Sequence, residues 1–247
     1  ENPVYRKRNS FIDIRYSQSV QDIIPRIEKL RDNLGSLTLT PYQTNIIKKA
    51  ITDILDPDQV AQNSFPFILH SFNISEIEKL TDQELPRFLF YRYRYEVFPQ
   101  QFQLDEFPPC LQIEPTSICN YRCVFCYQVD TSFSKKNNGM MGTMSFDLFK
   151  SLIDDAEGNC EAISLASRGE PLICPDIEDI RDLCKEKDIL LIEDCAQCLG
   201  AELNGTYAGG FGDFATFSFH AQKNLTTLGE GGMISVNSEK LYKNGQY

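Results

Sequence analysis

The sequence has no long apolar run and no excess of basic residues, and both absences exclude classes of function. No apolar stretch approaches the roughly 20 residues that span a membrane, and the first thirty residues lack the charged-then-apolar pattern of a signal peptide. Asp and Glu number 35 against 24 Lys and Arg, which gives a formal net charge of -11. Because this charge repels nucleic acid and anionic membranes, we expect a cytoplasmic protein that acts on small molecules, with neither nucleic acid nor membrane as a partner.

Cysteine, by contrast, is frequent, since the chain of 247 residues contains nine. In a chain of this length without a secretory signal, reduced thiols that serve metal or redox chemistry are favoured over a disulfide framework. Hydrophobic residues make up 42% of the sequence, which is enough to bury a core. The sequence begins at Glu1 rather than at methionine, so we expect a fragment of a longer protein or a processed chain.

Residues 1–108 contain little glycine and show helical periodicity. In TPYQTNIIKKAITDIL the apolar residues recur at three- and four-residue spacing, and Pro41 stands where a first helical turn tolerates proline. The segment FLFYRYRYEVF, residues 88–98, alternates aromatic and basic residues, a pattern on which single-stranded nucleic acid can stack. The acidic chain favours the other interpretation, a half-buried strand or helix face with solvated arginines. We therefore predict a helical N-terminal region over 1–108.

From residue 109 the pattern changes to alternating strands and helices, which predicts an α/β fold. CLQIEPTSICN is a short apolar run that ends in a loop, SFDLFKSLIDDA is amphipathic with Ser145 as its N-cap, and AISLAS indicates a buried strand. Together they predict a parallel βαβ unit. Further along, DIEDIRDLCKEKD predicts a helix, and ILLIED, FATFSF and GGMISVN predict strands.

Three cysteines lie within eight residues of the loop that follows the first of these strands. The segment CNYRCVFC places Cys119, Cys123 and Cys126 close enough for their thiolates to bind one cofactor. A structural zinc site normally has C-x2-C pairs and four ligands, so zinc requires Cys110 or Cys160 as a fourth ligand and is the less favoured alternative. Packing alone seldom explains three thiols at such spacing.

The spacing C-x3-C-x-aromatic-C resembles the signature of the radical S-adenosylmethionine (SAM) superfamily, with Phe125 at the aromatic position. The resemblance implies a [4Fe–4S] cluster held by the three cysteines, with SAM bound to the iron that no cysteine ligates. It also implies radical chemistry, in which cleavage of SAM yields a radical that abstracts hydrogen from a substrate.

A second segment, SRGEPLI, resembles the G-G-E-P segment of the same superfamily. The resemblance implies that Gly169, Glu170 and Pro171 contact SAM. Arg168 replaces the first glycine of the pattern. The part of the chain that resembles this superfamily corresponds to the first two strands of a partial (βα) barrel.

The later part of the chain, LLIEDCAQCLGAELNGTYAGGFGDFATFSFHAQKNLTTLGEGGMISVN, differs from the rest of such a barrel. It resembles the DegT/DnrJ/EryC1/StrS family of sugar aminotransferases, which use pyridoxal phosphate (PLP). The resemblance assigns roles to Asp194 at the pyridine nitrogen, Gln197 beside the phenolic oxygen, Ser218 at the phosphate and Lys223 as Schiff-base lysine and proton carrier. Lysine rather than histidine at position 223 implies transamination rather than dehydration.

Cys195 and Cys198 form a C-x-x-C sequence within this segment. Such a sequence can indicate a thiol oxidoreductase. The surrounding residues match the aminotransferases, and no thioredoxin-like context accompanies the two cysteines. The oxidoreductase interpretation is therefore disfavoured.

We therefore predict an α/β protein with a helical region over 1–108, a partial radical SAM domain over 109–175 and part of a PLP-transferase large domain, of the aspartate aminotransferase type, over 176–247. Both later parts lack segments of their families, which favours a chimeric sequence over a genuine fusion. Radical SAM chemistry with a [4Fe–4S] cluster is the leading function, PLP-dependent transamination of a nucleotide sugar is the alternative, and an inactive or zinc-binding fragment is the third. The second resemblance also implies a homodimer, because members of that family commonly build the site between two chains.

Overall fold

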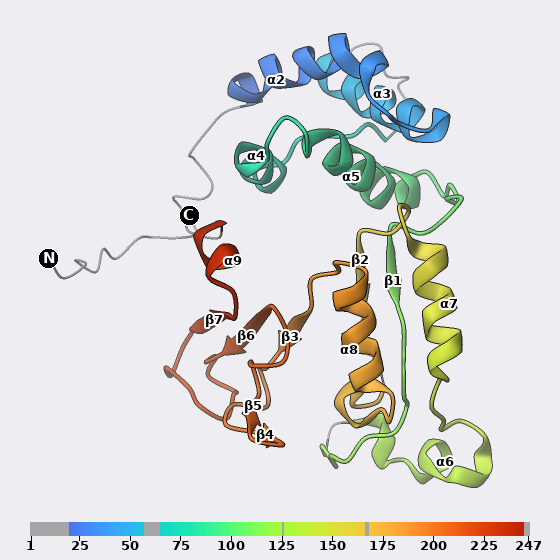
Figure 1. Ribbon diagram of the computed structural model, residues 1–247, viewed down its shortest axis with the longest axis vertical. Helices are drawn as coiled ribbons and strands as arrows, with labels where there is room; N and C mark the ends of the chain where they lie inside the picture. Colours follow the sequence, from blue (N-terminus) through green and yellow to red (C-terminus); the bar gives the residue numbers. More distant parts are fainter. Residues whose placement is uncertain (1–19, 57–64, 125, 166–167, 245–247) are drawn as a thin grey trace, which may run out of the picture. The chain divides into compact units, whose positions relative to one another are not determined.

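The computed structural model describes residues 20–56, 65–124, 126–165 and 168–244. Helices predominate in the first of these ranges, and short strands alternate with helices and loops after residue 109 (Figure 1). Mixed α/β structure was the fold class expected from the sequence, and the described elements confirm it. Within the described ranges, every helix is too short or too polar to cross a membrane.

Contacts between residues divide the chain into two compact units. The first comprises residues 1–112 and 156–164, and the second comprises residues 113–155 and 165–247. The domain boundaries predicted from the sequence lie after residues 108 and 175 instead, and those domain assignments stay a prediction.

Four helices form most of the described part of the first unit. They are α2 (Val20–Asn33), α3 (Pro41–Leu55), α4 (Ser71–Lys79) and α5 (Leu85–Gln100), with the short 3-10 helix η1 (Leu34–Ser36) after α2. The start of α3 is fixed by a capping box, in which the Thr40 hydroxyl accepts the Gln43 N–H at 3.1 Å and the Gln43 side chain accepts the Thr40 N–H at 3.0 Å. Pro41 follows at the first helical position, as its spacing predicted.

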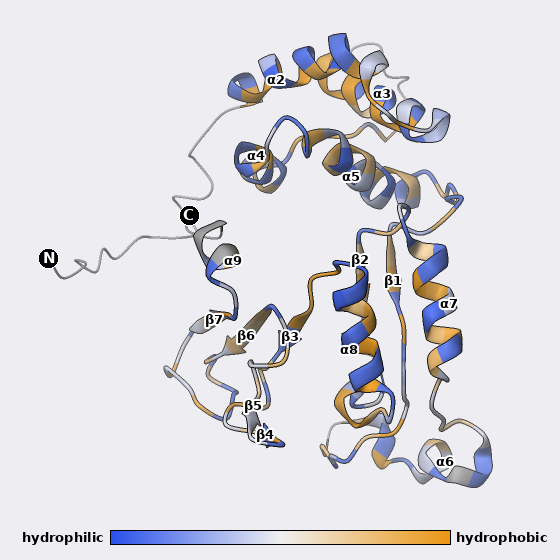
Figure 2. Ribbon diagram, in the orientation of Figure 1, coloured by the Kyte–Doolittle hydropathy of each residue, from blue (hydrophilic) through white to orange (hydrophobic). Residues whose placement is uncertain are grey.

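The core of the first unit lies between these helices. Apolar residues gather on the sides of α2 and α3 that face α4 and α5 (Figure 2). Ile27, Ala50, Ile77 and Leu89, one from each helix, have no exposed surface. This single cluster of apolar side chains continues along α5 to Phe98. The periodicity of TPYQTNIIKKAITDIL thus predicts the buried face of α3 correctly.

The alternating aromatic and basic segment forms part of helix α5. We predicted solvated arginines in this segment, and that prediction is wrong. The side chain of Arg94 is 2% exposed and that of Arg92 is 13% exposed. The Nε atom of Arg94 donates to Asp105 at 2.7 Å, and its terminal nitrogens donate to the carbonyl oxygens of Asn159 and Phe107. These partners are distant in sequence, so local alternation could not reveal them.

Strands β1 (Cys110–Gln112) and β2 (Ala162–Ser164) pair in parallel, with Leu111 opposite Ile163. The chain between them contains helix α7 (Phe146–Ala156), which confirms the predicted order of strand, helix and strand. Ser145 caps α7, because its carbonyl accepts the Phe149 N–H at 3.1 Å. The prediction that β2 is buried is wrong: Ala162 and Ser164 are exposed, since only two strands form this sheet within the described residues.

The second unit contains a three-stranded sheet in the order β3, β6, β7. Its elements are α8 (Ile177–Glu186), β3 (Ile192–Asp194), β4 (Glu202–Leu203), β5 (Thr206–Tyr207), β6 (Phe214–Ser218), β7 (Gly232–Val236) and α9 (Glu239–Asn244). Before them lie η3 (Tyr127–Val129), α6 (Thr131–Ser134), η4 (Lys136–Asn138) and η5 (Pro171–Ile173). Strands β3 and β6 are parallel, whereas β6 and β7 are antiparallel.

One face of this sheet is covered and the opposite face is largely open. Ala215 and Phe217 of β6 are buried with Cys195 on the covered face. A side chain at Gly209, whose φ is +95°, would place its Cβ 2.6 Å from the Phe217 ring, so this close approach requires glycine. On the open face Ile192 is 63% exposed and Ile234 is 67% exposed.

Candidate functional site

The carboxyl ends of β3 and β6 meet at one edge of the sheet, because the two strands are parallel. Asp194 is the last residue of β3 and lies opposite Thr216 of β6. The Cys195 N–H donates to the Thr216 carbonyl at 2.8 Å, which extends the pairing by one residue. Ser218 ends β6 at the same edge. Two of the residues predicted to contact PLP therefore end neighbouring strands.

Asp194 presents an exposed carboxylate that its own turn holds in place. Its Oδ1 atom accepts the Ala196 N–H at 3.0 Å. A carboxylate has two oxygens and several acceptor positions, so this bond orients the group and leaves acceptor capacity for a ligand. Such a carboxylate can accept a hydrogen bond from a protonated ring nitrogen.

Lys223 lies in the loop of residues 219–231 that connects β6 to β7, here called the Lys223 loop. Its N–H donates to the His220 carbonyl at 2.9 Å, and its side chain is half-buried. The side-chain amide of the next residue, Asn224, donates to the carbonyl of Gln197 at 3.0 Å. This bond joins the Lys223 loop to the turn that follows Asp194. The four residues predicted for PLP thus come from two adjoining segments at one edge of the sheet.

Glu193 is a structural residue of this site that the sequence analysis missed. It precedes Asp194 in β3, and its carboxylate accepts the N–H groups of Gly209, Phe211 and Gly212 at 2.9, 2.8 and 2.7 Å. These bonds fix the loop of residues 208–213 that connects β5 to β6, here called the glycine-rich loop. Alternation along β3 could have indicated it, since successive side chains point to opposite faces and a carboxylate on the covered face needs partners.

The cysteine loop brings its three predicted ligands to one small cavity. Cys119, Cys123 and Cys126 all line it, and its volume is about 20 Å³. Phe125, the aromatic residue of the same motif, lies outside the described residues. A cavity of this volume has room for about one water molecule.

The zinc alternative requires a site that could bind a single metal ion. In the part of the chain that the structure describes, no three His, Cys, Asp or Glu side chains are arranged to hold one ion. Cys110 and Cys160, the predicted fourth ligands of a zinc site, have other neighbours: the Cys110 sulfur lies 3.6 Å from the Tyr91 hydroxyl, and the Cys160 thiol donates to the Ala162 carbonyl at 3.2 Å. The zinc alternative thus gains no support.

The segment predicted to contact SAM packs against the cysteine loop's preceding residues. The Glu170 N–H donates to the Ile118 carbonyl at 2.9 Å, and the Glu170 carboxylate accepts the Leu172 N–H at 3.2 Å. A Cβ at Gly169 would lie 1.9 Å from the Thr116 carbonyl oxygen, so only glycine fits there. Pro171 begins η5. These contacts give Gly169, Glu170 and Pro171 structural roles without a ligand.

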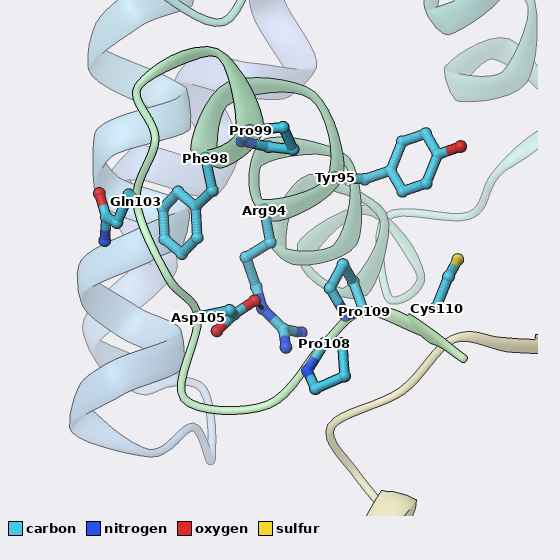
Figure 3. A pocket seen from close by; sticks show the side chains of 9 residues that line it. All are labelled: Arg94, Tyr95, Phe98, Pro99, Gln103, Asp105, Pro108, Pro109 and Cys110. Carbon is cyan, nitrogen blue, oxygen red and sulfur yellow. Dashed lines mark hydrogen bonds and ion pairs between the residues drawn. The ribbon is translucent and has the colours of Figure 1, made fainter. Parts of the chain in front are cut away.

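A larger cavity, of about 460 Å³, lies in the first unit at the end of α5 (Figure 3). Arg94 and Asp105 are among its lining residues, together with proline and aromatic rings. The Arg94 guanidinium is engaged by Asp105 and by two backbone carbonyls, so its donors are used within the protein. The charged pair that lines this cavity is thus engaged within the protein, and prolines and aromatic rings form much of the remaining lining.

Comparison with known proteins gives matches to one family of aminotransferases. Residues 165–246 match the model of the DegT/DnrJ/EryC1/StrS aminotransferase family. The chain is 52% identical over 64 residues to the GDP-perosamine synthase of Vibrio cholerae, an alignment that covers 26% of this chain and 17% of that protein. It is 48% identical over 66 residues to the dTDP-4-dehydro-2,3,6-trideoxy-D-glucose 4-aminotransferase of Saccharopolyspora spinosa, covering 27% of this chain and again only 17% of the relative.

A solved structure of an aminotransferase from Psychrobacter cryohalolentis aligns with a TM-score of 0.33 and 22% identity over 55% of this chain and 33% of that chain, which is too weak to support a common fold. The sequence matches support the aminotransferase part of the prediction, and they give no support to a radical SAM part or to a chimera. The matched range begins at residue 165, so it includes the segment Gly169–Pro171 that we assigned to SAM.

Proposed function

We propose that residues 165–246 form part of the cofactor site of a PLP-dependent aminotransferase that acts on a nucleotide sugar. The observation that carries the proposal is the hydrogen bond between Asn224 and the Gln197 carbonyl, at 3.0 Å. It joins the segment that follows Asp194 to the loop that contains Lys223. The family match over residues 165–246 supports the same assignment.

The residues present fit PLP in their chemistry. Asp194 is an exposed carboxylate fixed by the Ala196 N–H, Ser218 offers a hydroxyl at the end of β6, and Lys223 offers an amine. When bound, PLP supplies an electron-withdrawing ring that stabilises negative charge on a substrate carbon. We propose that Asp194 keeps a proton on the ring nitrogen by accepting its hydrogen bond, and that Ser218 donates to the phosphate.

Lys223 would have two roles. Its Nζ atom would hold the cofactor covalently before the substrate arrives, and after release it would take a proton from the substrate carbon and return it to the cofactor's carbon. The Asn224 bond to Gln197 would keep the Lys223 loop near Asp194 during both steps. A nucleotide sugar is the proposed substrate class because the named relatives act on such sugars. The expected homodimer stays a prediction.

Binding of PLP by matched variants tests this proposal. The purified chain should develop the visible absorbance of lysine-bound PLP when it is titrated with the cofactor, and Lys223→Arg should abolish that absorbance. Lys185→Arg is the control, because Lys185 is an exposed lysine of α8. The proposal fails if both variants keep the absorbance or if neither the wild type nor the control develops it.

Radical SAM chemistry is the second candidate, and one observation favours it. The three motif cysteines line a single cavity. Among the residues described, Cys123 is exposed, and Arg122 donates to the carbonyls of Cys119 and Tyr121.

Anaerobic reconstitution with iron and sulfide separates the two candidates. The radical SAM candidate requires a brown protein with about four irons per chain, which Cys123→Ser should abolish and Cys184→Ser should leave unchanged. We expect a colourless protein instead, because the sequence matches support the aminotransferase family and give no support to radical SAM chemistry. A brown wild-type protein with intact Cys184→Ser and colourless Cys123→Ser would overturn that expectation.

A further inference from the structure

Cys195 and Cys198 occupy the two ends of a tight turn directly after β3. The Cys198 N–H donates to the Cys195 carbonyl at 3.3 Å, which defines a β-turn of four residues. The end Cα atoms of such a turn lie within about 7 Å, and a disulfide joins Cα atoms that are about 4.4–6.8 Å apart. Backbone geometry of this kind permits a disulfide without a large movement of the chain.

The two side chains also lie together. Cys198 packs against the buried cluster that contains Cys195, Ala215 and Phe217. Cys195 is 2% exposed, whereas Cys198 is half-buried. An oxidant from solvent therefore reaches Cys198 first, and Cys195 is in place to react with the oxidised sulfur.

We propose that Cys195 and Cys198 form a reversible disulfide when the protein meets a peroxide, and that this bond alters the Lys223 loop. In the first step the peroxide oxidises the Cys198 thiol to a sulfenic acid, and one oxygen of the peroxide leaves as water or alcohol. In the second step the Cys195 sulfur attacks the Cys198 sulfur, the S–S bond forms and a water molecule leaves. A dithiol reductant reverses the change by thiol–disulfide exchange.

Burial and neighbouring groups keep the resting pair protonated. Burial is the largest cause that raises the pKa of Cys195 to about 12, followed by the charge and hydrogen bond of Cys198 and by the carboxylates of Glu193 and Asp194. The pKa of Cys198 is raised mainly by burial, with Glu170 also contributing. Both groups are therefore thiols at neutral pH, and because the thiolate is the form that reacts with peroxide, we expect the disulfide to form slowly at neutral pH and faster as the pH is raised.

The coupling to the Lys223 loop follows from the residue between the two cysteines. Gln197 lies within the turn, and its carbonyl accepts the hydrogen bond of the Asn224 side chain. Closing the disulfide brings the two sulfurs to about 2.05 Å, which displaces the Gln197 carbonyl relative to Asn224. If PLP binds as proposed above, oxidation would then weaken it, a consequence that rests on the proposed function.

Trypsin provides a clean test of the disulfide, because the peptide of residues 188–223 contains only these two cysteines. The full chain is treated with hydrogen peroxide, unfolded, alkylated and digested. We expect this peptide to lose two hydrogen atoms and to escape alkylation, and to become doubly alkylated after dithiothreitol. Cys198→Ser should prevent the change, and Cys184→Ser should not. Full alkylation of both cysteines at a dose that oxidises the exposed Cys123 would overturn the proposal.

Hydrogen exchange tests the coupling without any cofactor. Peroxide should raise the amide exchange of the Lys223 loop several-fold in the wild type and leave it unchanged in Cys198→Ser. A disulfide that forms without altering this exchange would refute the coupling. Since neither readout uses PLP, failure of the proposed function would appear separately, as an absence of lysine-bound PLP in the fully reduced protein.

Discussion

Replacing Glu193 by alanine should release the glycine-rich loop beneath the sheet. The Glu193 carboxylate accepts three backbone N–H groups at 2.7–2.9 Å. Hydrogen bonds to charged groups contribute about 1.5–3 kcal/mol each, and because this carboxylate is only half-buried and serves all three donors, we use about 1 kcal/mol for each bond. Glu193→Ala should therefore lower the local free energy of opening by about 3 kcal/mol.

Hydrogen exchange of the amides of Gly209, Phe211 and Gly212 measures this loss directly. At 1.4 kcal/mol for each factor of ten, about 3 kcal/mol corresponds to an increase in exchange of about a hundredfold. Glu193→Gln should give a smaller increase, because the amide retains one acceptor oxygen. Glu202→Gln is the control, since Glu202 is exposed on β4 of the same unit. Unchanged exchange in Glu193→Ala would refute the role we assign to the carboxylate.

Two further predictions concern the helical unit. Arg94→Lys should destabilise it by about 3 kcal/mol in urea unfolding, because lysine cannot bond Asp105 and two carbonyls together. The control is Arg87→Lys, at a side chain that is 72% exposed, which should change stability little. Equal effects of the two substitutions would contradict this prediction. The pKa values of Tyr42 and Tyr93 are raised to about 12, first by burial. Because unfolded tyrosine has a pKa near 10, the two buried neutral tyrosines should stabilise the helical unit fully below a pH of about 10, and this contribution should be lost as the pH rises toward 12. Phenolate absorbance from both tyrosines near pH 10, with the helical circular dichroism intact, would be inconsistent with their burial.

Local patterns predicted the elements that position the candidate site. ILLIED and FATFSF contain β3 and β6, and DIEDIRDLCKEKD contains α8. Alternation and helical periodicity depend on the nearest neighbours in sequence, so the sequence was sufficient for them. The roles of Asp194 and Lys223 came from a family resemblance, and they stay predictions.

The β4–β5 hairpin was missed although its signal was present. Asn204 and Gly205 form its turn with φ values of +50° and +82°, and an Asn-Gly pair is the strongest short-range hairpin signal. Partners that are distant in sequence could not be predicted in this way. The burial of Arg94 depends on Asp105 and Asn159, and the exposure of β2 depends on the number of strands that join its sheet. Periodicity describes neither.

The central claim, a PLP site built around Lys223, is tested most directly by reduction of the cofactor-loaded protein with borohydride and mapping of the labelled lysine. Trypsin cannot cleave after a lysine that carries the cofactor, so the peptide of residues 188–240 should replace the peptide of residues 188–223. We predict label at Lys223 in preference to exposed lysines such as Lys185, and weaker labelling in Asp194→Asn. Labelling spread evenly over the exposed lysines would contradict the claim.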